Sequence, residues 1–142
     1  MTIAWVIPGR LARSSRPGFG AATPTDVDPV EVEAWLVEAR AKGIRSILCL
    51  LDERQLGYYP RLPGGLLETY RRAGMAVSSV AVPDLQTPPI PPSVLPRVWQ
   101  AFRALPPPLL IHCSAGVDRT GAAVAYLLDR LSPGPNPEGG LR

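Results

Sequence analysis

The sequence predicts an α/β fold in which a mostly parallel central sheet is flanked by helices. Short apolar runs, typical of buried strands, alternate along the chain with longer segments of helical character. Helix start and stop signals lie between successive apolar runs. At 142 residues the chain has the length of one domain. Alternating strands and helices build βα units, and such units give a parallel sheet covered on both faces.

Four strands and four helices are expected along the chain. The strands cover residues 3–7, 46–51, 76–82 and 109–111, and the helices cover residues 28–42, 66–73, 93–105 and 120–131. Two segments rich in Gly and Pro, 10–25 and 83–92, are expected to be loops. We therefore expect a single domain over residues 1–131, followed by an irregular tail over residues 132–142.

Local signals define these elements in order. Pro8 and Gly9 end the first strand. Asp28 is a good N-cap and Pro29 occupies the first helical position, so the first helix begins there and stops before Gly43. A glycine also ends the second helix, and three prolines separate the third helix from the last strand. That strand is short and wholly apolar, as buried parallel strands are.

Composition excludes several classes of protein. The net charge is +3, from 14 Arg and one Lys against 12 acidic residues, and no basic run resembles a nucleic-acid patch. No stretch approaches the roughly 20 apolar residues of a membrane span. Two cysteines without a secretion signal argue for the cytoplasm, where thiols stay reduced. We expect a monomer or homodimer with no nucleic-acid or membrane partner, and the Arg- and Ala-rich composition indicates a bacterial source.

A candidate anion-binding loop follows the strand expected at residues 109–111. The segment HCSAGVDRTG (112–121) contains Cys113, Gly116 and, six positions after the cysteine, Arg119. Cysteine and arginine at this spacing are a weak signal alone, but their position between a strand and a helix makes it strong. The loop can curl so that its amides point inward at a phosphate group, while the helix adds its positive end.

The residue types of this loop fit the hydrolysis of a phosphate monoester. Arg119 offers a planar fork to two phosphate oxygens, and the positive field favours the thiolate of Cys113 as nucleophile. Thr120 can donate its hydroxyl to the sulfur. The expected substrate-binding residues are Ser114, Ala115, Gly116, Val117, Asp118 and Thr120. This chemistry requires no metal ion and no cofactor.

The expulsion of an alkoxide or phenoxide from phosphorus needs a general acid. Asp84 lies in VPDLQTPP (82–89), after another predicted strand and 29 residues before Cys113. One helix and one strand between them can return the chain to the same edge of the sheet. We expect Asp84 to be the acid and base, with Asp118 as the rival acid and an ordinary turn role for Asp84 as the alternative.

The chain resembles the cysteine-based protein tyrosine phosphatase superfamily, and more narrowly its small dual-specificity and archaeal or bacterial members. The resemblance rests on HCSAGVDRTG (112–121), VPDLQTPP (82–89) and WVIPGRLARSSRPG (5–18). It implies a dual-specificity-like fold with a shortened C-terminal end, acting on a phosphorylated protein or a small phosphate ester. It also implies Cys113 as nucleophile, Arg119 as phosphate clamp and Asp84 as acid and base.

Departures from the family pattern leave alternatives open. A polar residue, often Gln, positions the hydrolytic water in relatives, and Gln86 is a candidate substitute here. Val117 stands where a phosphoinositide-specific branch carries Lys, which makes an inositol-lipid substrate less favoured. The alternative functions are a phosphate-binding module with poor turnover, a phosphoinositide phosphatase and a sulfurtransferase. Cys49 is expected in the core, and a disulfide with Cys113 requires the two strands to be neighbours.

Overall fold

The computed structural model describes residues 3–132, in which strands and helices alternate as the sequence predicts. The strands are β1 (Ala4–Ile7), β2 (Leu11–Ser14), β3 (Ser46–Cys49), β4 (Ala76–Ser79) and β5 (Leu109–His112); the helices are α1 (Pro29–Ala41), α2 (Glu53–Leu56), α3 (Gly65–Arg72), α4 (Leu95–Ala104) and α5 (Asp118–Leu131). Apart from Ser132, the tail expected after α5 lies outside the described residues. Among residues 3–132, no helix combines the length and apolar character needed to cross a bilayer.

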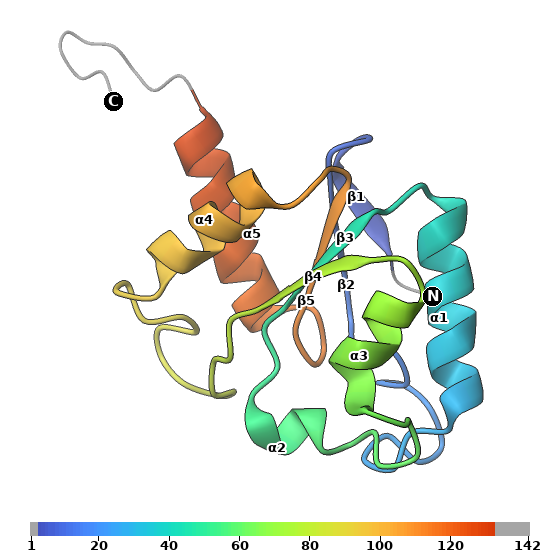
Figure 1. Cartoon of the computed structure of the whole chain (residues 1–142). Coiled ribbons are helices and arrows are strands. Elements are labelled where there is room, and N and C mark those ends of the chain that lie inside the picture. The colour runs from blue at the N-terminus through green and yellow to red at the C-terminus, as the bar shows by residue number, and fades with distance from the viewer. Residues whose placement is uncertain (1–2, 133–142) are drawn as a thin grey trace, which may run out of the picture.

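The five strands form one sheet in the order β1-β2-β5-β3-β4 (Figure 1). β1 runs antiparallel to β2, whereas the pairs β2–β5, β5–β3 and β3–β4 are parallel. Because parallel strands end at the same edge, the loops that follow β2, β3, β4 and β5 meet there. The predicted mostly parallel sheet is confirmed.

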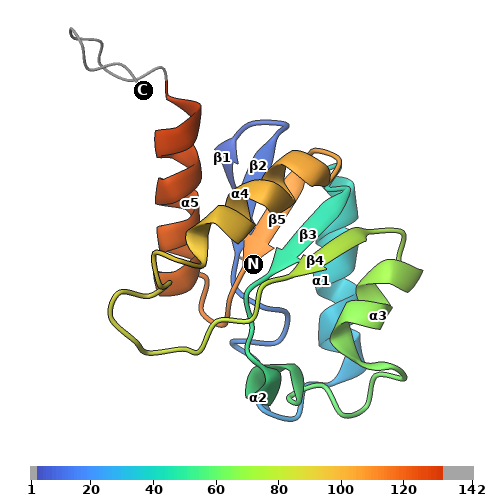
Figure 2. The ribbon, with the colours of Figure 1, turned by 60° about the vertical axis from the view of Figure 1, so that its left-hand side comes forward.

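Helices cover both faces of this sheet (Figure 2). α1 and α3 pack on one face, and α4 and α5 pack on the other. Successive residues of β5 point to opposite faces, so Leu110 packs in the core with Trp35 and Tyr70, whereas Leu109 and Ile111 pack in the core under α4 and α5. The predicted α/β architecture is confirmed, with both faces of the sheet buried.

The loop predicted over residues 10–25 is wrong in its first part, because Leu11–Ser14 is strand β2. This strand pairs with β1 on one side and with β5 on the other. Only its first two residues, Leu11 and Ala12, are apolar, and Arg13 and Ser14 follow them. Two apolar residues followed by two polar ones do not show the alternation of apolar and polar residues that predicts a strand. Pairing with two neighbours places Leu11 and Ala12 in the core and stabilises the strand here.

The short helix α2 is also absent from the sequence prediction. Asp52 Oδ1 accepts a hydrogen bond from the Gln55 amide at 2.9 Å, and Gln55 Oε1 lies 3.4 Å from the Asp52 amide. These two contacts are a capping box, which the Asp-x-x-Gln pattern could have indicated. The boundaries of the other predicted elements differ from the observed ones by at most three residues.

Candidate active site

The loop between β5 and α5 has the features of an anion-binding site. Residues 113–117 form the connection, and α5 begins at Asp118 without a side-chain cap. Within residues 3–132 the amides of residues 114–119 donate no hydrogen bond. Amides at a helix N-terminus that lack partners carry partial positive charge and bind anions. The structure therefore brings the predicted cradle residues together as consecutive unbonded donors.

Hydrogen bonds from outside the loop hold its first carbonyl groups. His112 Nδ1 lies 3.0 Å from the Cys113 carbonyl oxygen. The Arg16 amide donates to the Ser114 carbonyl at 2.9 Å, and Arg16 Nε donates to Ser114 Oγ at 3.0 Å. In a planar trans peptide the carbonyl and the following N–H point in opposite directions. A carbonyl held from outside therefore directs the next amide toward the interior of the loop.

Arg13 holds the second half of the loop in the same way. Its Nη2 donates to the carbonyl oxygens of Gly116 at 2.9 Å and Val117 at 3.4 Å. Gly116 has a φ of +78°, and a Cβ at this position would lie 2.5 Å from the Ser14 carbonyl oxygen. Only glycine fits this backbone conformation against β2.

Arg119 is buried below the loop and is held on one side only. Its Nη1 donates to the Val82 carbonyl at 2.8 Å, to Gln55 Oε1 at 2.9 Å and to the Leu50 carbonyl at 3.2 Å. Nε and Nη2 have no hydrogen-bond partner within the described residues, although Nη2 lies 3.2 Å from Asp84 Oδ2 as an ion pair. The Nε–Nη2 edge is one that can bind two phosphate oxygens. Because buried donors without acceptors cost free energy, this edge is suited to receive an anion.

The loop after β4 brings Asp84 to this arginine. Asp84 Oδ2 accepts from Gln55 Nε2 at 3.1 Å, and Oδ1 accepts from the Leu85 amide at 2.9 Å. The carboxyl side chain is 23% exposed, so it can reach both solvent and a bound substrate. Asp118, the rival acid, is exposed at the start of α5 and forms no ion pair with Arg119 within residues 3–132. Of the two carboxylates, Asp84 is the one that contacts Arg119.

Three positioning residues of this site were missed by the sequence analysis: Arg13, Arg16 and Gln55. Gln55 is buried, and its side-chain amide bridges Arg119 and Asp84. The capping-box pattern indicates that Gln55 is in a helix, but not that the helix faces this site. Arg13 and Arg16 lie within WVIPGRLARSSRPG (5–18), on which the resemblance partly rests, but nothing local in that segment shows that they contact the loop between β5 and α5.

One contact expected from the sequence is not formed. Thr120 Oγ1 is buried and has no hydrogen-bond partner within residues 3–132, so it does not donate to the Cys113 sulfur in this structure. Gln86 Nε2 donates to the Pro89 carbonyl of its own loop at 3.4 Å. The glutamine that contacts Arg119 and Asp84 is Gln55. In the described part of the chain, no three His, Cys, Asp or Glu side chains are grouped as a metal site requires.

His112 supports the loop as a neutral side chain. Because the Cys113 carbonyl can only accept, Nδ1 carries the proton, and Nε2 accepts from the Tyr70 hydroxyl at 2.8 Å. Burial lowers the pKa of His112 from 6.5 to about 4; the hydrogen bond to Cys113 opposes this shift, and the charges of Arg16 and Arg119 add to it. A neutral imidazole with a hydrogen bond at each ring nitrogen orients the loop.

Cys49 lies on the opposite face of the sheet from Cys113. It pairs in register with His112 and packs in the core under α1 and α3, whereas Cys113 packs in the core under α4 and α5. β3 and β5 are neighbours, as a disulfide would require, but the two sulfurs point to different faces. Burial raises the pKa of the Cys49 thiol to about 12. This cysteine is a core residue.

Comparisons with known proteins agree with this geometry. Residues 86–132 match the sequence model of the tyrosine phosphatase family, a stretch that contains Cys113 and Arg119 and begins after Asp84. A search of curated proteins gives no significant match.

Three solved structures share the fold. The core catalytic domain of the PP-IP phosphatase SIW14 from S. cerevisiae has a TM-score of 0.59 and 22% identity, over 92% of this chain and 67% of that one. Tk-PTP has a TM-score of 0.54 and 20% identity, over 92% and 74%. A DUF442 protein from Shewanella putrefaciens CN-32, described as a phosphatase, has a TM-score of 0.56 and 12% identity, over 91% and 72%. These structures confirm the predicted fold. The family match confirms the resemblance to tyrosine phosphatases and supports a hydrolase of phosphate esters.

We expect the free energy of unfolding to fall as the pH is lowered from about 6.5 to about 4. In this window the unfolded chain protonates its histidine while buried His112 stays neutral, so the unfolded state binds more protons. The loss can reach about 3 kcal/mol. Urea unfolding at pH 7 and pH 4.5 measures this loss of stability. The variant His112→Asn keeps a donor toward the Cys113 carbonyl but does not titrate, so its free energy of unfolding should depend less on pH. An equally steep dependence in this variant would exclude His112 as its source.

We expect iodoacetate to modify Cys113 much faster than Cys49 at neutral pH. Cys49 is fully buried and its pKa of about 12 leaves almost no thiolate, whereas Cys113 lies beside the unbonded amides at the start of α5. Mass spectrometry of tryptic peptides after brief exposure gives the two rates. Vanadate should protect Cys113, and Cys113→Ser should leave the protein unmodified. Equal rates, or no protection, would count against an anion site in this loop.

Proposed function

We propose that this chain is a protein-tyrosine or dual-specificity phosphatase that hydrolyses phosphate monoesters through a cysteinyl-phosphate intermediate. The observation that carries the proposal is the buried Nε–Nη2 edge of Arg119, which lacks a hydrogen-bond partner within the described residues beside a loop of unbonded amides. A phosphate dianion would provide acceptors for both sets of donors. A neutral ligand group such as an amide or a hydroxyl has fewer acceptor oxygens than a phosphate and could not satisfy both the loop amides and the Arg119 edge.

In the first step Cys113 is the nucleophile. Its sulfur donates an electron pair to phosphorus, the bond from phosphorus to the ester oxygen breaks, and Asp84 gives its proton to that oxygen. Arg119 and the loop amides hold the three phosphoryl oxygens while charge spreads over them. Thr120, whose hydroxyl is buried and unbonded in the described structure, is assigned to donate to the sulfur.

In the second step water hydrolyses the intermediate. Asp84, now ionised, accepts a proton from the water as its oxygen attacks phosphorus, and the phosphorus–sulfur bond breaks. The electron pair returns to the sulfur of Cys113, and inorganic phosphate leaves. Gln55 is assigned to position the carboxyl of Asp84 for both transfers, because its Nε2 donates to Asp84 Oδ2.

Asp84 and the substrate compete for the same part of Arg119. Asp84 Oδ2 lies against Nη2 and accepts from Gln55 Nε2, while Oδ1 accepts from the Leu85 amide. A phosphate bound to the Nε–Nη2 edge displaces this carboxylate. The displaced carboxyl group of Asp84 then lies beside the ester oxygen, where we assign it as the acid.

The rim of the loop favours a phosphopeptide over a more highly charged substrate. Val117 is 62% exposed and offers an apolar surface to a ring or side chain of the substrate. Asp118 is exposed next to it and repels additional phosphate groups. Because the fold neighbour SIW14 is a PP-IP phosphatase, an inositol pyrophosphate belongs among the substrates tested.

The direct test compares wild type, Cys113→Ser and Asp84→Ala on phosphotyrosine and phosphoserine peptides, phosphoinositides and an inositol pyrophosphate. We expect Cys113→Ser to abolish turnover while the thermal unfolding midpoint stays close to wild type. Asp84→Ala should lower kcat by roughly 10²- to 10⁴-fold on phosphoserine, whose alkoxide needs a proton, and by less on p-nitrophenyl phosphate. One stoichiometric release of p-nitrophenol followed by no turnover would identify a phosphate-binding module instead.

We expect Gln55→Leu to lower kcat on a phosphotyrosine peptide by roughly 10- to 100-fold, because Arg119 loses an acceptor and Asp84 loses a donor. Gln86→Leu is the matched control. Within residues 3–132 the Gln86 side chain bonds only the Pro89 carbonyl of its own loop, so this change should alter kcat little. Gln55→Glu keeps the acceptor for Arg119 but removes the donor to Asp84. If Gln55→Glu retained wild-type kcat, the contact with Asp84 would have no part in the reaction.

A further inference from the structure

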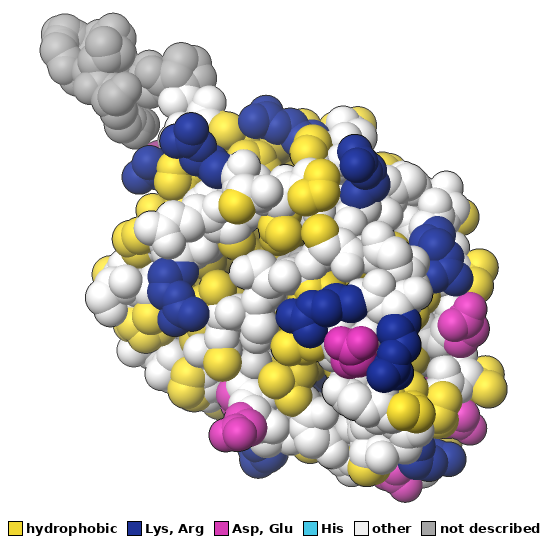
Figure 3. All heavy atoms as spheres, in the orientation of Figure 1, with side chains coloured by type: hydrophobic (Ala, Val, Ile, Leu, Met, Phe, Trp, Pro, Cys, Tyr) yellow, Lys and Arg dark blue, Asp and Glu magenta, His cyan; other side chains and the backbone are white. Residues whose placement is uncertain are grey.

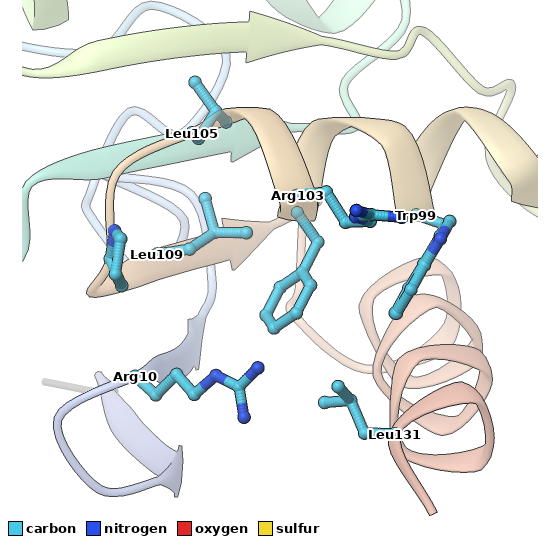
Figure 4. A pocket seen from close by; sticks show the side chains of 8 residues that line it. Arg10, Trp99, Arg103, Leu105, Leu109 and Leu131 are labelled. Carbon is cyan, nitrogen blue, oxygen red and sulfur yellow. The ribbon is translucent and has the colours of Figure 1, made fainter.

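A pocket of about 310 Å³ lies at the end of the sheet opposite the candidate active site (Figure 4). It is lined by Arg10, Trp99, Phe102, Arg103, Leu105, Pro107, Leu109 and Leu131. Leu109 begins β5, and Cys113 follows the other end of that strand. The pocket is therefore separated from the phosphate loop by the length of the strand. Its volume is within the range of sites that bind small molecules.

The walls of this pocket are apolar and contain two stacked rings. The centroids of Trp99 and Phe102 lie 5.9 Å apart with an angle of 25° between the ring planes. Leu109 and Leu131 extend into the same space from β5 and α5 (Figure 4). An apolar body placed here would be removed from water on several sides, which stabilises binding in proportion to the area buried.

Three arginines surround these apolar walls. The guanidinium of Arg10 lies 5.3 Å from the centroid of Phe102, and those of Arg103 and Arg130 lie 5.9 Å and 4.5 Å from the centroid of Trp99. Within residues 3–132 none of the three is in an ion pair. Figure 3 shows basic side chains gathered at the end of the molecule where α5 ends, and acidic side chains mostly toward the other end. The pocket is thus apolar inside and positive at its rim.

We propose that this pocket binds a small amphipathic anion, a carboxylate carried on an aromatic or short aliphatic body. The body would pack against Trp99 and Phe102, and the carboxylate would accept hydrogen bonds from Arg10 and Arg103. A neutral apolar occupant would offer no acceptor to the exposed guanidinium groups of Arg10 and Arg103, and a cation would be repelled. A second copy of the chain docked on this face would bring arginine rims together, which like-charge repulsion opposes.

Three probes with the same body and different head groups test this proposal: 4-phenylbutyrate, 4-phenylbutanamide and 4-phenylbutylamine. Binding is followed by NMR through the indole N–H of Trp99, assigned by its loss in Trp99→Phe. We expect 4-phenylbutyrate to bind at least about tenfold more tightly than the amide, because charge-assisted hydrogen bonds are the stronger ones, and the amine to bind most weakly. Equal affinity for the three probes would overturn the proposal.

Variants locate the site. We expect Arg10→Gln combined with Arg103→Gln to weaken 4-phenylbutyrate binding by about tenfold or more. Arg97→Gln is the matched control, because Arg97 lies on the same helix as Arg103 but does not line this pocket. Thermal unfolding of each variant checks that the fold is retained. Equal binding by the double variant and the control would overturn the proposal.

Two further measurements distinguish binding in this pocket from binding at the phosphate loop and from dimer formation. Saturation of the phosphate loop with vanadate should leave 4-phenylbutyrate binding unchanged, because the two sites lie at opposite ends of β5. Displacement of the probe by vanadate would place its binding at the phosphate loop and overturn the proposal. Sedimentation of the free protein should show no dimer held through this face. A dimer that Arg103→Glu dissociates would identify a second copy as the occupant instead.

Discussion

The buried guanidinium of Arg119 is the group on which the rest of the candidate active site depends. A full positive charge is stable inside a protein only when acceptors surround it. Nη1 has three acceptors, from Leu50 and Val82, which follow β3 and β4, and from Gln55 of α2. Because Leu50 and Gln55 follow β3 whereas Val82 follows β4, the one charge joins these two connections. The opposite edge is left for an anion, and Asp84 lies against part of it.

Parallel pairing explains why these groups meet. Each parallel strand leads into a segment that contributes one side chain of the site at the same edge of the sheet: Arg16 after β2, Gln55 after β3, Asp84 after β4 and Cys113 after β5. These four residues are far apart in the sequence, and the sheet brings them together in space. The covering helices bury both faces, so the carboxyl edge is where polar side chains of these loops can converge.

The two side chains packed below the phosphate loop, His112 and Tyr70, are uncharged. The positive charge of the site therefore lies at Arg119 and at the loop amides, where an anion can bind. His112 and Tyr70 are both fully buried and hydrogen-bonded to each other. The pKa of His112 falls mainly because the imidazole is buried, and the positive charges of Arg16 and Arg119 lower it further. The loop carbonyls are then held by neutral N–H groups and by Arg13, and the amides remain for the ligand.

The sequence by itself determined the order of strands and helices, because apolar runs, caps and glycine stops are local signals. It also determined the candidate nucleophile and clamp, since HCSAGVDRTG (112–121) lies within one connection. Only the tertiary structure decided that β2 exists, because its four residues carry no strand pattern and pairing with β1 and β5 places Leu11 and Ala12 in the core. It alone brought Arg13 to Gly116, 103 residues away, and Gln55 to Arg119, 64 residues away. Local patterns carry no information about which distant carbonyl or guanidinium a side chain will meet, and the packing of the sheet supplies it.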